Sequence, residues 1–450
     1  MKKKPTILVV GNENPDLHNL REKYNLIFRN AVYSTSPFAQ AKEMLTSLEG
    51  RQLDGVVGFH DKDSPVAAII AQECHLVGPP PYAVYLGQNK VLFSQHMKQE
   101  QLSYPDTTII NITSTAFPSF DYPIFIKPSK GRLSAFAFMI HSQQEFEEKL
   151  AWLNQQPRGE MYTVFEDFFL HFGNTYSPSW NWYLVQPFID AEQYTVDAFV
   201  FDQKVYIIGV VQSIYTEDRK SFRRFDFPGA FPKDLTGKLQ GLLEKVVKTI
   251  GFDNNGFDLE FFLTPEGEII IIELNTRISQ GFNSLYQQYY VYSPYEMMLE
   301  LCLGHMPSLE VKEKARPISS FPLRVKHDHL VTRIPRPEEI ENLKKTFDIA
   351  NIEILVEEGK KLSDYWQDGY SYRYALLDIP GDNLDQIKEK CTLLLEHLPL
   401  ELQKIDSSVV SSRSGTIYGL SPSSGRDDAE ERTTGIGISL GGEALDTLSG

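Results

Sequence analysis

A run of four isoleucines at residues 269–272 constrains the fold more than any other feature of the chain. A continuous apolar run of this kind is typical of a strand that is buried on both faces of a sheet. A second apolar stretch, residues 257–263, precedes it, and Thr-Pro-Glu-Gly at 264–267 separates the two. Such residues favour a turn. The segment therefore predicts a buried β-hairpin with arms at 257–263 and 268–274.

Polar side chains interrupt both arms of this hairpin. Glu260 lies on the first arm and Glu273 on the second, and the turn brings the two arms side by side. Asn275 and Arg277 follow Glu273 at steps of two residues, so they point to the same side of the strand. Two carboxylates and an amide oxygen are ligands that Mg²⁺ prefers, with phosphates and water supplying the rest. An arginine beside them suits a phosphoryl group in transfer.

A surface hairpin with solvated charges would show the same alternation of polar residues. The isoleucine run argues against this alternative. A strand that is buried on both faces and ends in Glu-Leu-Asn-Thr-Arg must provide partners for those polar groups, because unpaired polar groups are costly to bury. We therefore favour a site for a metal ion and phosphate.

The hairpin resembles the metal-binding hairpin of the ATP-grasp superfamily, and is especially similar to that of the biotin carboxylase branch and of amino-acid ligases. The resemblance implies ATP and Mg²⁺ as cofactors, with Mn²⁺ as the alternative ion. It implies that Glu260 and Glu273 are metal ligands, with Asn275 on a second ion. Arg277 would stabilise an acyl phosphate and the transition state that forms it.

The resemblance also implies an α+β architecture with the ATP-grasp fold. An N-terminal α/β (Rossmann-like) domain is expected at 1–85, an ATP-grasp domain of two lobes at 86–308, and a C-terminal α+β subdomain at 309–405. Residues 406–450 are rich in Ser, Thr, Gly and acidic residues, and predict a disordered tail.

Periodicity along the N-terminal half supports alternating strands and helices. Strands are expected at 6–11 and 53–59, and helices at 16–30, 64–73 and 84–97. Further along, 157–178 is aromatic without a regular repeat and is interpreted as an irregular insertion.

Two lysines match the positions at which the family holds nucleotide phosphates. Lys90 follows Gly78–Pro81 at the spacing at which the family places its first ATP-binding lysine. The alternative is a surface lysine that is in contact with solvent and binds nothing. Lys127 ends a short apolar strand and would hold phosphate as a point charge. The loop 129–134 would cover the phosphates with backbone N–H groups and the Ser134 hydroxyl. Phe262 would pack under the adenine ring, or be plain core.

The segment 185–192 resembles the hinge between the two ATP-grasp lobes. By this resemblance Gln186, Phe188 and Ile189 contact adenine, partly through backbone groups, and Glu192 accepts from the ribose hydroxyls. Most relatives have Glu where Gln186 stands, but the Gln amide oxygen still accepts from the adenine amino group. An ordinary amphipathic strand pair is the alternative reading of this segment.

Composition limits the partners. The formal net charge of the 450 residues is −16, which argues against a nucleic-acid partner because phosphate backbones require a net basic face. The three cysteines show no metal-binding or CxxC pattern, so reduced thiols are expected. No apolar stretch has the length of a membrane span. We expect a cytoplasmic protein with no membrane partner. A homodimer is one expected assembly, because many members of the family that it resembles form dimers.

Three functions fit these patterns. The first is a ligase that joins a small-molecule or peptide carboxylate to an amine nucleophile through an acyl phosphate. The second is a biotin-carboxylase-like enzyme that activates bicarbonate, although the loop 129–134 lacks the expected glycine run. The third is a catalytically silent nucleotide-binding regulatory protein. In the basic segment 218–227, Arg223 or Arg224 would pair with a substrate carboxylate, unless this is a solvated loop.

Overall fold

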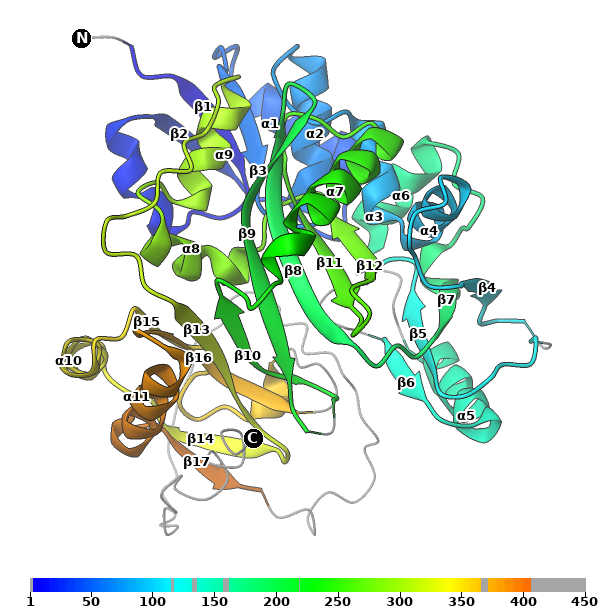
Figure 1. Ribbon diagram of the computed structural model, residues 1–450. Helices are drawn as coiled ribbons and strands as arrows, with labels where there is room; N and C mark the ends of the chain where they lie inside the picture. The colour runs from blue at the N-terminus through cyan, green and yellow to red at the C-terminus, as the bar shows by residue number, and fades with distance from the viewer. Residues whose placement is uncertain are drawn as a thin grey trace, which may run out of the picture. The chain divides into compact units, whose positions relative to one another are not determined.

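The computed structural model describes residues 3–114, 117–131, 136–156, 162–217, 219–365 and 371–405 (Figure 1). The chain divides into two compact units. The first contains Met1–Gln212 and Gly229–Lys312, and the second contains Ser213–Pro228 and the described part of Glu313–Gly450. The predicted tail at 406–450 lies outside the described residues, and the domain boundaries at 85, 308 and 405 stay predictions.

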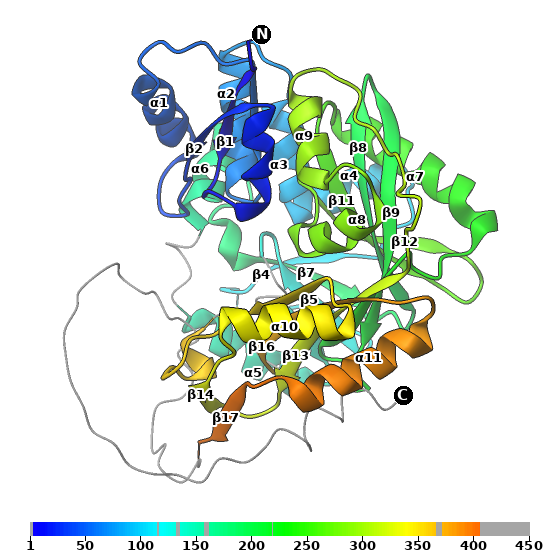
Figure 2. The same cartoon turned by 90° about the vertical axis from the view of Figure 1, so that its left-hand side faces the viewer.

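The first unit begins with a three-stranded parallel sheet in the order β2-β1-β3. Its elements are β1 Thr6–Val10, β2 Asn25–Arg29, β3 Gly55–Gly58, α1 Pro37–Ser47 and α2 Asp63–Glu73. The central strand β1 is buried along its whole length. Helix α2 packs on this sheet and α1 packs on α2 (Figure 2). The expected strands at 6–11 and 53–59 and the helix at 64–73 are thus confirmed.

The helix predicted at residues 16–30 is wrong. The chain there forms two short 3₁₀ turns, Pro15–Leu17 and Asn19–Glu22, and then enters β2. Leu17 and Leu20 are buried at a spacing of three residues, which explains the helical pattern. Pairing with β1 then takes over, because a strand that completes a sheet outweighs local periodicity.

The helix predicted at residues 84–97 is divided into two. Helix α3 spans Pro81–Gln88 and α4 spans Lys90–Gln99, and the chain leaves helical geometry at Asn89 (φ −97°, ψ 98°). The Asn89 side chain accepts a hydrogen bond from a backbone N–H in the first turn of α4 (3.2 Å), as an N-cap residue does. Because of this break, Lys90 is the first residue of α4.

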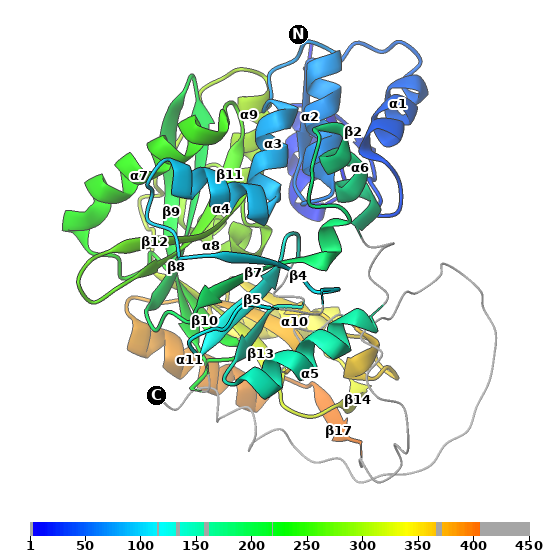
Figure 3. The same ribbon diagram turned by 90° about the vertical axis from the view of Figure 1, so that its right-hand side faces the viewer.

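A four-stranded antiparallel sheet in the order β4-β7-β5-β6 follows in the first unit. Its elements are β4 Thr108–Asn111, β5 Ile124–Pro128, β6 Phe138–Ile140, β7 Trp182–Pro187 and α5 Gln143–Asn154. Helix α5 lies along this sheet (Figure 3), and the Trp152 ring of α5 is 5.8 Å from the Phe138 ring of β6.

The described part of 157–178 is not irregular throughout, because it contains helix α6, Thr163–His171. Phe165, Phe168 and Phe169 are buried on this helix. The ring of Phe168 lies 6.2 Å from that of Phe38 in α1. The high aromatic content concealed an amphipathic helix that covers the N-terminal part of the unit.

The third sheet of the first unit has the order β12-β11-β8-β9. Its elements are β8 Glu192–Phe201, β9 Lys204–Tyr215 (the last three residues belong to the second unit), β11 Gly256–Leu263, β12 Ile269–Asn275, α7 Thr236–Ile250, α8 Asn283–Tyr289 and α9 Pro294–Cys302. The predicted hairpin is confirmed, since β11 and β12 pair antiparallel. Leu259, Phe261 and Ile271 are fully buried in one core with residues of α7.

The second unit contains antiparallel strands in the order β10-β13-β16-β15 and a separate pair, β14 with β17. Its elements are β10 Phe222–Phe227, β13 Ile318–Val325, β14 His329–Arg333, β15 Asn351–Ile354, β16 Tyr372–Pro380, β17 Glu401–Lys404, α10 Pro337–Phe347 and α11 Leu384–His397. Helices α10 and α11 share a core with β13 and β16. Across the described residues of both units, no helix combines the length and apolarity needed to span a bilayer.

Candidate functional site

The register of the hairpin brings the predicted metal-binding residues together. Glu260 of β11 is directly opposite Glu273 of β12, and Asp258 is opposite Asn275. An irregularity after Glu260 shifts the register by one residue. Asn275 Nδ2 donates a hydrogen bond to Asp258 (2.8 Å), which fixes the amide through its nitrogen, the atom that a metal ion does not need.

Strand β8 pairs with β11 and adds polar residues to the same face of the sheet. Asp197 is opposite Asp258, and Thr195 is opposite Glu260. Asp197 accepts from the Tyr286 hydroxyl (2.7 Å) and from the Ser279 N–H (2.7 Å). The sequence analysis missed both aspartates. Asp258 could have been found by the two-residue step that found the others, because it precedes Glu260 by two positions.

The carboxyls on this face have divergent proton affinities. Burial and the nearby charge of Glu273 raise the pKa of Glu260 to about 8. Burial also opposes ionisation of Glu273, but Lys90 and Lys127 outweigh it and hold the pKa of Glu273 below its usual range. Burial and the charge of Asp258 raise the pKa of Asp197 to about 7.

Both predicted phosphate lysines lie against the hairpin. Lys90 Nζ is 3.2 Å from Glu273 Oε2, and the Lys90 backbone N–H donates to the carbonyl of Ser129 (2.9 Å) at the end of β5. Lys127 Nζ donates to the carbonyl of Ile272 (2.8 Å). Burial lowers the pKa of Lys127 to about 8, against the opposing effect of Glu273.

The close approach of α3 to β12 sets the position of Lys90. A Cβ atom at Gly87 would lie 2.7 Å from Thr276 Cγ2 and 2.8 Å from Leu274 Cδ2, so no larger residue fits without movement. The next residue, Gln88, donates through Nε2 to Thr276 Oγ1 (3.1 Å). Helix and strand are therefore in direct contact two and three residues before Lys90.

Arg277 belongs to an ion-pair network that the sequence did not predict. Its Nε donates to Asp61 Oδ1 (2.9 Å) and its Nη1 donates to Asp258. Asp61 follows β3, and its other oxygen accepts from Lys130 Nζ (3.2 Å). No sequence spacing links residues 61, 130 and 277, so only the tertiary fold reveals this cluster.

The predicted hinge connects the second and third sheets, since β7 ends at Pro187 and β8 begins at Glu192. Gln186 is buried and donates through Nε2 to Thr107 Oγ1 (2.9 Å). The Phe188 N–H donates to the carbonyl of Pro123 (3.1 Å). Ile189 is half-buried.

Two further nucleotide candidates lie on the third sheet. Glu192 accepts from the Tyr194 hydroxyl (2.8 Å). Phe262 is half-buried, pairs with Gln193, and shares a strand face with Glu260. These residues therefore lie on the strand that continues from the hinge and on its neighbour.

Three predicted residues remain. Ser134 lies outside the described residues. Arg223 and Arg224 are on β10 in the second unit. Arg224 is buried and donates through Nε to Asp226 Oδ1 (2.7 Å), whereas Arg223 is half-buried.

The donor set fits Mg²⁺ that takes part of its coordination from a ligand. In the described part of the chain, no group of three or more His, Cys, Asp or Glu side chains is arranged to hold a metal ion by itself. Glu260, Glu273 and Asn275 offer two carboxylates and one amide oxygen on neighbouring strands. Mg²⁺ is commonly held by one or two carboxylates together with phosphates.

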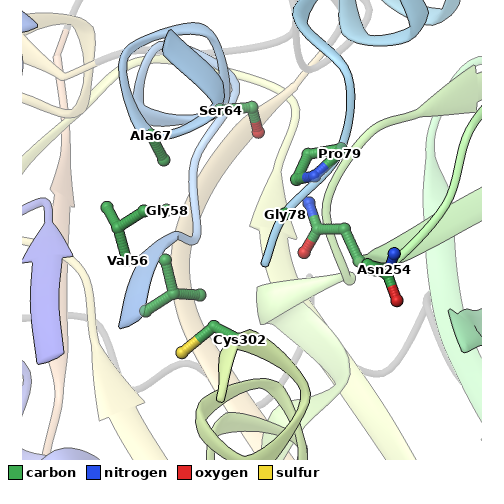
Figure 4. Close-up of a pocket in the computed structure, with 10 residues that line it drawn as sticks. Val56, Gly58, Ser64, Ala67, Gly78, Pro79, Asn254 and Cys302 are labelled. Carbon is green, nitrogen blue, oxygen red and sulfur yellow. The ribbon is translucent and has the colours of Figure 1, made fainter. Parts of the chain in front are cut away.

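A small cavity is lined by residues of β3, the start of α2 and the end of α9. Its volume is about 10 Å³, the space of a single water molecule. Ser64, Pro79, Asn254 and Cys302 are among the residues around it (Figure 4). This cavity is too small for a substrate.

Residues 120–284 match the family model of the ATP-grasp domain, a range that includes the hairpin, Lys127 and the hinge. No curated protein matches the chain.

Solved structures share the fold at low sequence identity. An L-amino acid ligase from Bacillus licheniformis is similar with a TM-score of 0.70 and 14% identity, covering 89% of this chain and 99% of that chain. Phosphoribosylglycinamide synthetase from Anaerococcus prevotii has a TM-score of 0.60 and 14% identity, covering 88% and 99%. The biotin carboxylase domain of 2-oxoglutarate carboxylase from Hydrogenobacter thermophilus, a dimer solved with MgADP, ADP and bicarbonate, has a TM-score of 0.56 and 13% identity, covering 89% and 86%. The predicted α+β, ATP-grasp fold is confirmed.

Proposed function

Because this chain contains an ATP-grasp domain, we propose that it is an ATP-dependent ligase that joins a carboxylate to an amine through an acyl phosphate. One observation carries the proposal. Glu260 and Glu273 are opposite each other on a buried hairpin, Asn275 follows on the same face, and Lys90 and Lys127 lie against the second arm. Two carboxylates, an amide and two lysines in one place match the charge pattern of a nucleotide with its metal ions.

In this proposal Glu260, Glu273 and Asn275 hold two Mg²⁺ ions, with Mn²⁺ as the alternative. The ions, when bound, neutralise charge on the ATP phosphates and make the γ-phosphorus more electrophilic. Lys90 and Lys127 contact phosphate oxygens. The pairing of Lys90 with Glu273 keeps that lysine at the hairpin before ATP arrives.

The hinge provides the adenosine contacts in this proposal. The amide nitrogen of Gln186 donates to Thr107. Its amide oxygen would accept a hydrogen bond from the adenine amino group. Phe188 and Ile189 border the adenine ring, Phe262 packs beneath it, and Glu192 accepts from the ribose. These roles rest on the resemblance and on the continuity of the hinge with β8.

The reaction has two steps. A carboxylate oxygen of the substrate attacks the γ-phosphorus of ATP, the bond to the β-phosphate oxygen breaks, and ADP leaves. The amine then attacks the carbonyl carbon of the acyl phosphate, the carbon–oxygen bond to phosphate breaks, and the amine loses a proton. Arg277 stabilises the anionic oxygens that develop in both steps. The chain contributes chiefly placement and charge stabilisation.

The substrates are proposed as classes: a small-molecule or peptide carboxylate and an amine nucleophile. The structural likeness to an amino acid ligase supports this choice over bicarbonate activation. Arg223 and Arg224 stay the predicted residues for the substrate carboxylate, and Arg224 is buried in a pair with Asp226.

Phosphate release from ATP tests the proposal. The full chain is incubated with ATP, Mg²⁺, pooled carboxylates and pooled amines, next to Glu273→Ala and to Glu266→Ala. Glu266 lies exposed in the turn of the same hairpin and serves as the matched control. We expect release that requires both pools, is lost in Glu273→Ala and is kept in Glu266→Ala.

Other outcomes identify the alternatives. Release that requires only bicarbonate would assign the carboxylase function. Nucleotide binding without release under any pool would favour a regulatory protein and contradict the ligase proposal.

A further inference from the structure

Asp61 connects two cations that come from separate parts of the first unit. Its Oδ1 accepts from Arg277 Nε (2.9 Å), after the hairpin, and its Oδ2 accepts from Lys130 Nζ (3.2 Å), after β5. Asp61 itself follows β3 of the N-terminal sheet. One carboxylate thus bridges two cations with one oxygen each, as a phosphate or carboxylate ligand would do.

Lys130 and Asp61 are largely removed from water, whereas Arg277 exposes 21% of its side chain. Lys130 is 2% exposed, and its ammonium lies 4.5 Å from the centre of the Phe165 ring, a cation–π distance. Burial alone would raise the pKa of Asp61, but the charges of Lys130 and Arg277 outweigh it and hold that pKa well below its usual range. Asp61 is therefore an anion beside these two cations.

Several contacts around Asp61 do not depend on its carboxylate. The Asp61 carbonyl is held by Gln88 Nε2 (3.0 Å), so the backbone is anchored independently of the carboxylate. Arg277 keeps its second partner, Asp258, when Asp61 is gone. The Lys130–Asp61 distance of 3.2 Å is longer than the 2.7–2.9 Å usual for a charge-assisted hydrogen bond, so this contact is the weaker one.

We propose that Lys130 and Arg277 form an oxyanion subsite, that Asp61 occupies this subsite in the structure, and that a phosphate oxygen replaces Asp61 during the reaction. The inference rests on the proposed function, in which phosphate is a product and an acyl phosphate the intermediate. It identifies Lys130 as the phosphate-binding side chain within the loop 129–134, and Asp61 as the anion that phosphate displaces.

The probe is inorganic phosphate. The full chain is first titrated with ADP and Mg²⁺, and the complex is then titrated with phosphate in a calorimeter. Asp61→Asn removes the competing anion and is expected to tighten phosphate binding about tenfold. Lys130→Met is expected to weaken it by about the same factor, and the double variant is expected to lose the gain that Asp61→Asn gives alone.

Lys62→Met is the matched control. Lys62 pairs with Asp63 (2.8 Å) in the same segment as Asp61, but neither group contacts Arg277 or Lys130 in any described interaction. We expect phosphate binding by this variant to equal that of the parent protein. Lys130→Arg, which keeps the positive charge, is expected to retain most of the affinity and decides the matter if Asp61→Asn fails to fold.

Two failures can be told apart. If MgADP binds but Lys130→Met binds phosphate as tightly as the parent protein, this inference is overturned and the proposed function stands. If the first titration shows no binding of MgADP, the proposed function fails and the inference fails with it.

Discussion

The ion pairs of the first unit's site and those around α10 in the second unit differ in burial and in origin. Lys130 and Asp61 expose 3% and 9% of their side chains, whereas Lys344 and Glu341 of α10 expose 29% and 58%. The first pair joins residues 69 positions apart and the second is an i,i+3 pair on one helix. Removing charges from water is costly. The comparison therefore indicates that the buried charges are kept for binding and chemistry, while the exposed ones are ordinary surface.

The largest expected effect is on turnover. Arg277→Ala removes the guanidinium proposed to stabilise the developing charge, and we expect kcat to fall on the order of 10³-fold, as for arginines in phosphoryl transfer. Lys344→Ala, which removes a cation of the exposed class, should leave kcat unchanged. Initial rates of phosphate release measure both. If Arg277→Ala kept more than a tenth of the rate, this would contradict the inference that the charges of the first unit's site are kept for chemistry.

The second effect is on stability. Asp61→Asn leaves Lys130 buried without its carboxylate and removes one partner of Arg277. Breaking a buried pair costs about 3–5 kcal/mol, so we expect a loss of that order in the free energy of unfolding. Urea denaturation measures it, with Lys344→Ala in the exposed pair on α10 as the control. A loss of less than about 1 kcal/mol in the free energy of unfolding would show that the Lys130–Asp61 pair contributes no more than an exposed ion pair does.

The third effect concerns pH. Burial and Glu273 raise the pKa of Glu260 to about 8, so this carboxyl holds a proton at neutral pH and Mg²⁺ must displace it. The affinity for Mg²⁺ in the presence of nucleotide should therefore rise with pH up to about 8 and level off above it.

Between pH 6.5 and 7.5 we expect the free Mg²⁺ needed for half-maximal nucleotide binding to fall up to about tenfold. Glu260→Gln removes this titration, and the slope that remains comes from the nucleotide and from Asp197, whose pKa is about 7. Equal slopes in the two proteins would show that Glu260 is already ionised.

The smallest effect belongs to the exposed class itself. Lys344→Ala breaks the i,i+3 pair with Glu341 (3.2 Å) on α10. Such pairs contribute about 0.2–0.5 kcal/mol, and alanine favours a helix, so the free energy of unfolding should change by less than about 0.5 kcal/mol. A parallel denaturation series with Asp61→Asn gives the ratio of the two effects. A loss above about 2 kcal/mol would contradict the comparison.

The same distinction explains what the sequence could predict. Glu260, Glu273, Asn275 and Arg277 were found because a strand alternates with a period of two and a turn sets the partner of each residue. These are local rules, and the fold class followed from them together with a family resemblance. In the hairpin, the strand pairing expected from the local sequence pattern is the pairing that the tertiary structure contains.

Asp61, and its pairing with Lys130 of the predicted loop 129–134, could not be found in this way. Their meeting depends on how the loop after β3 and the end of β5 approach the hairpin, and no periodicity records that. The helix predicted at 16–30 failed for a related reason, since pairing of β2 with β1 determined that segment. Tertiary contacts decide these cases.

The absence of a side chain at Gly87 has a consequence for how this chain tolerates change. Helix α3 touches the strand at Thr276 and Leu274 with no room for a methyl group, and Lys90 lies only three residues further on. The contact that sets the distance between Lys90 and Glu273 thus depends on a glycine, whose only substituent is a hydrogen atom. Even alanine at this position requires the Thr276 or Leu274 side chain to move, so the smallest substitution acts on the contact that precedes Lys90.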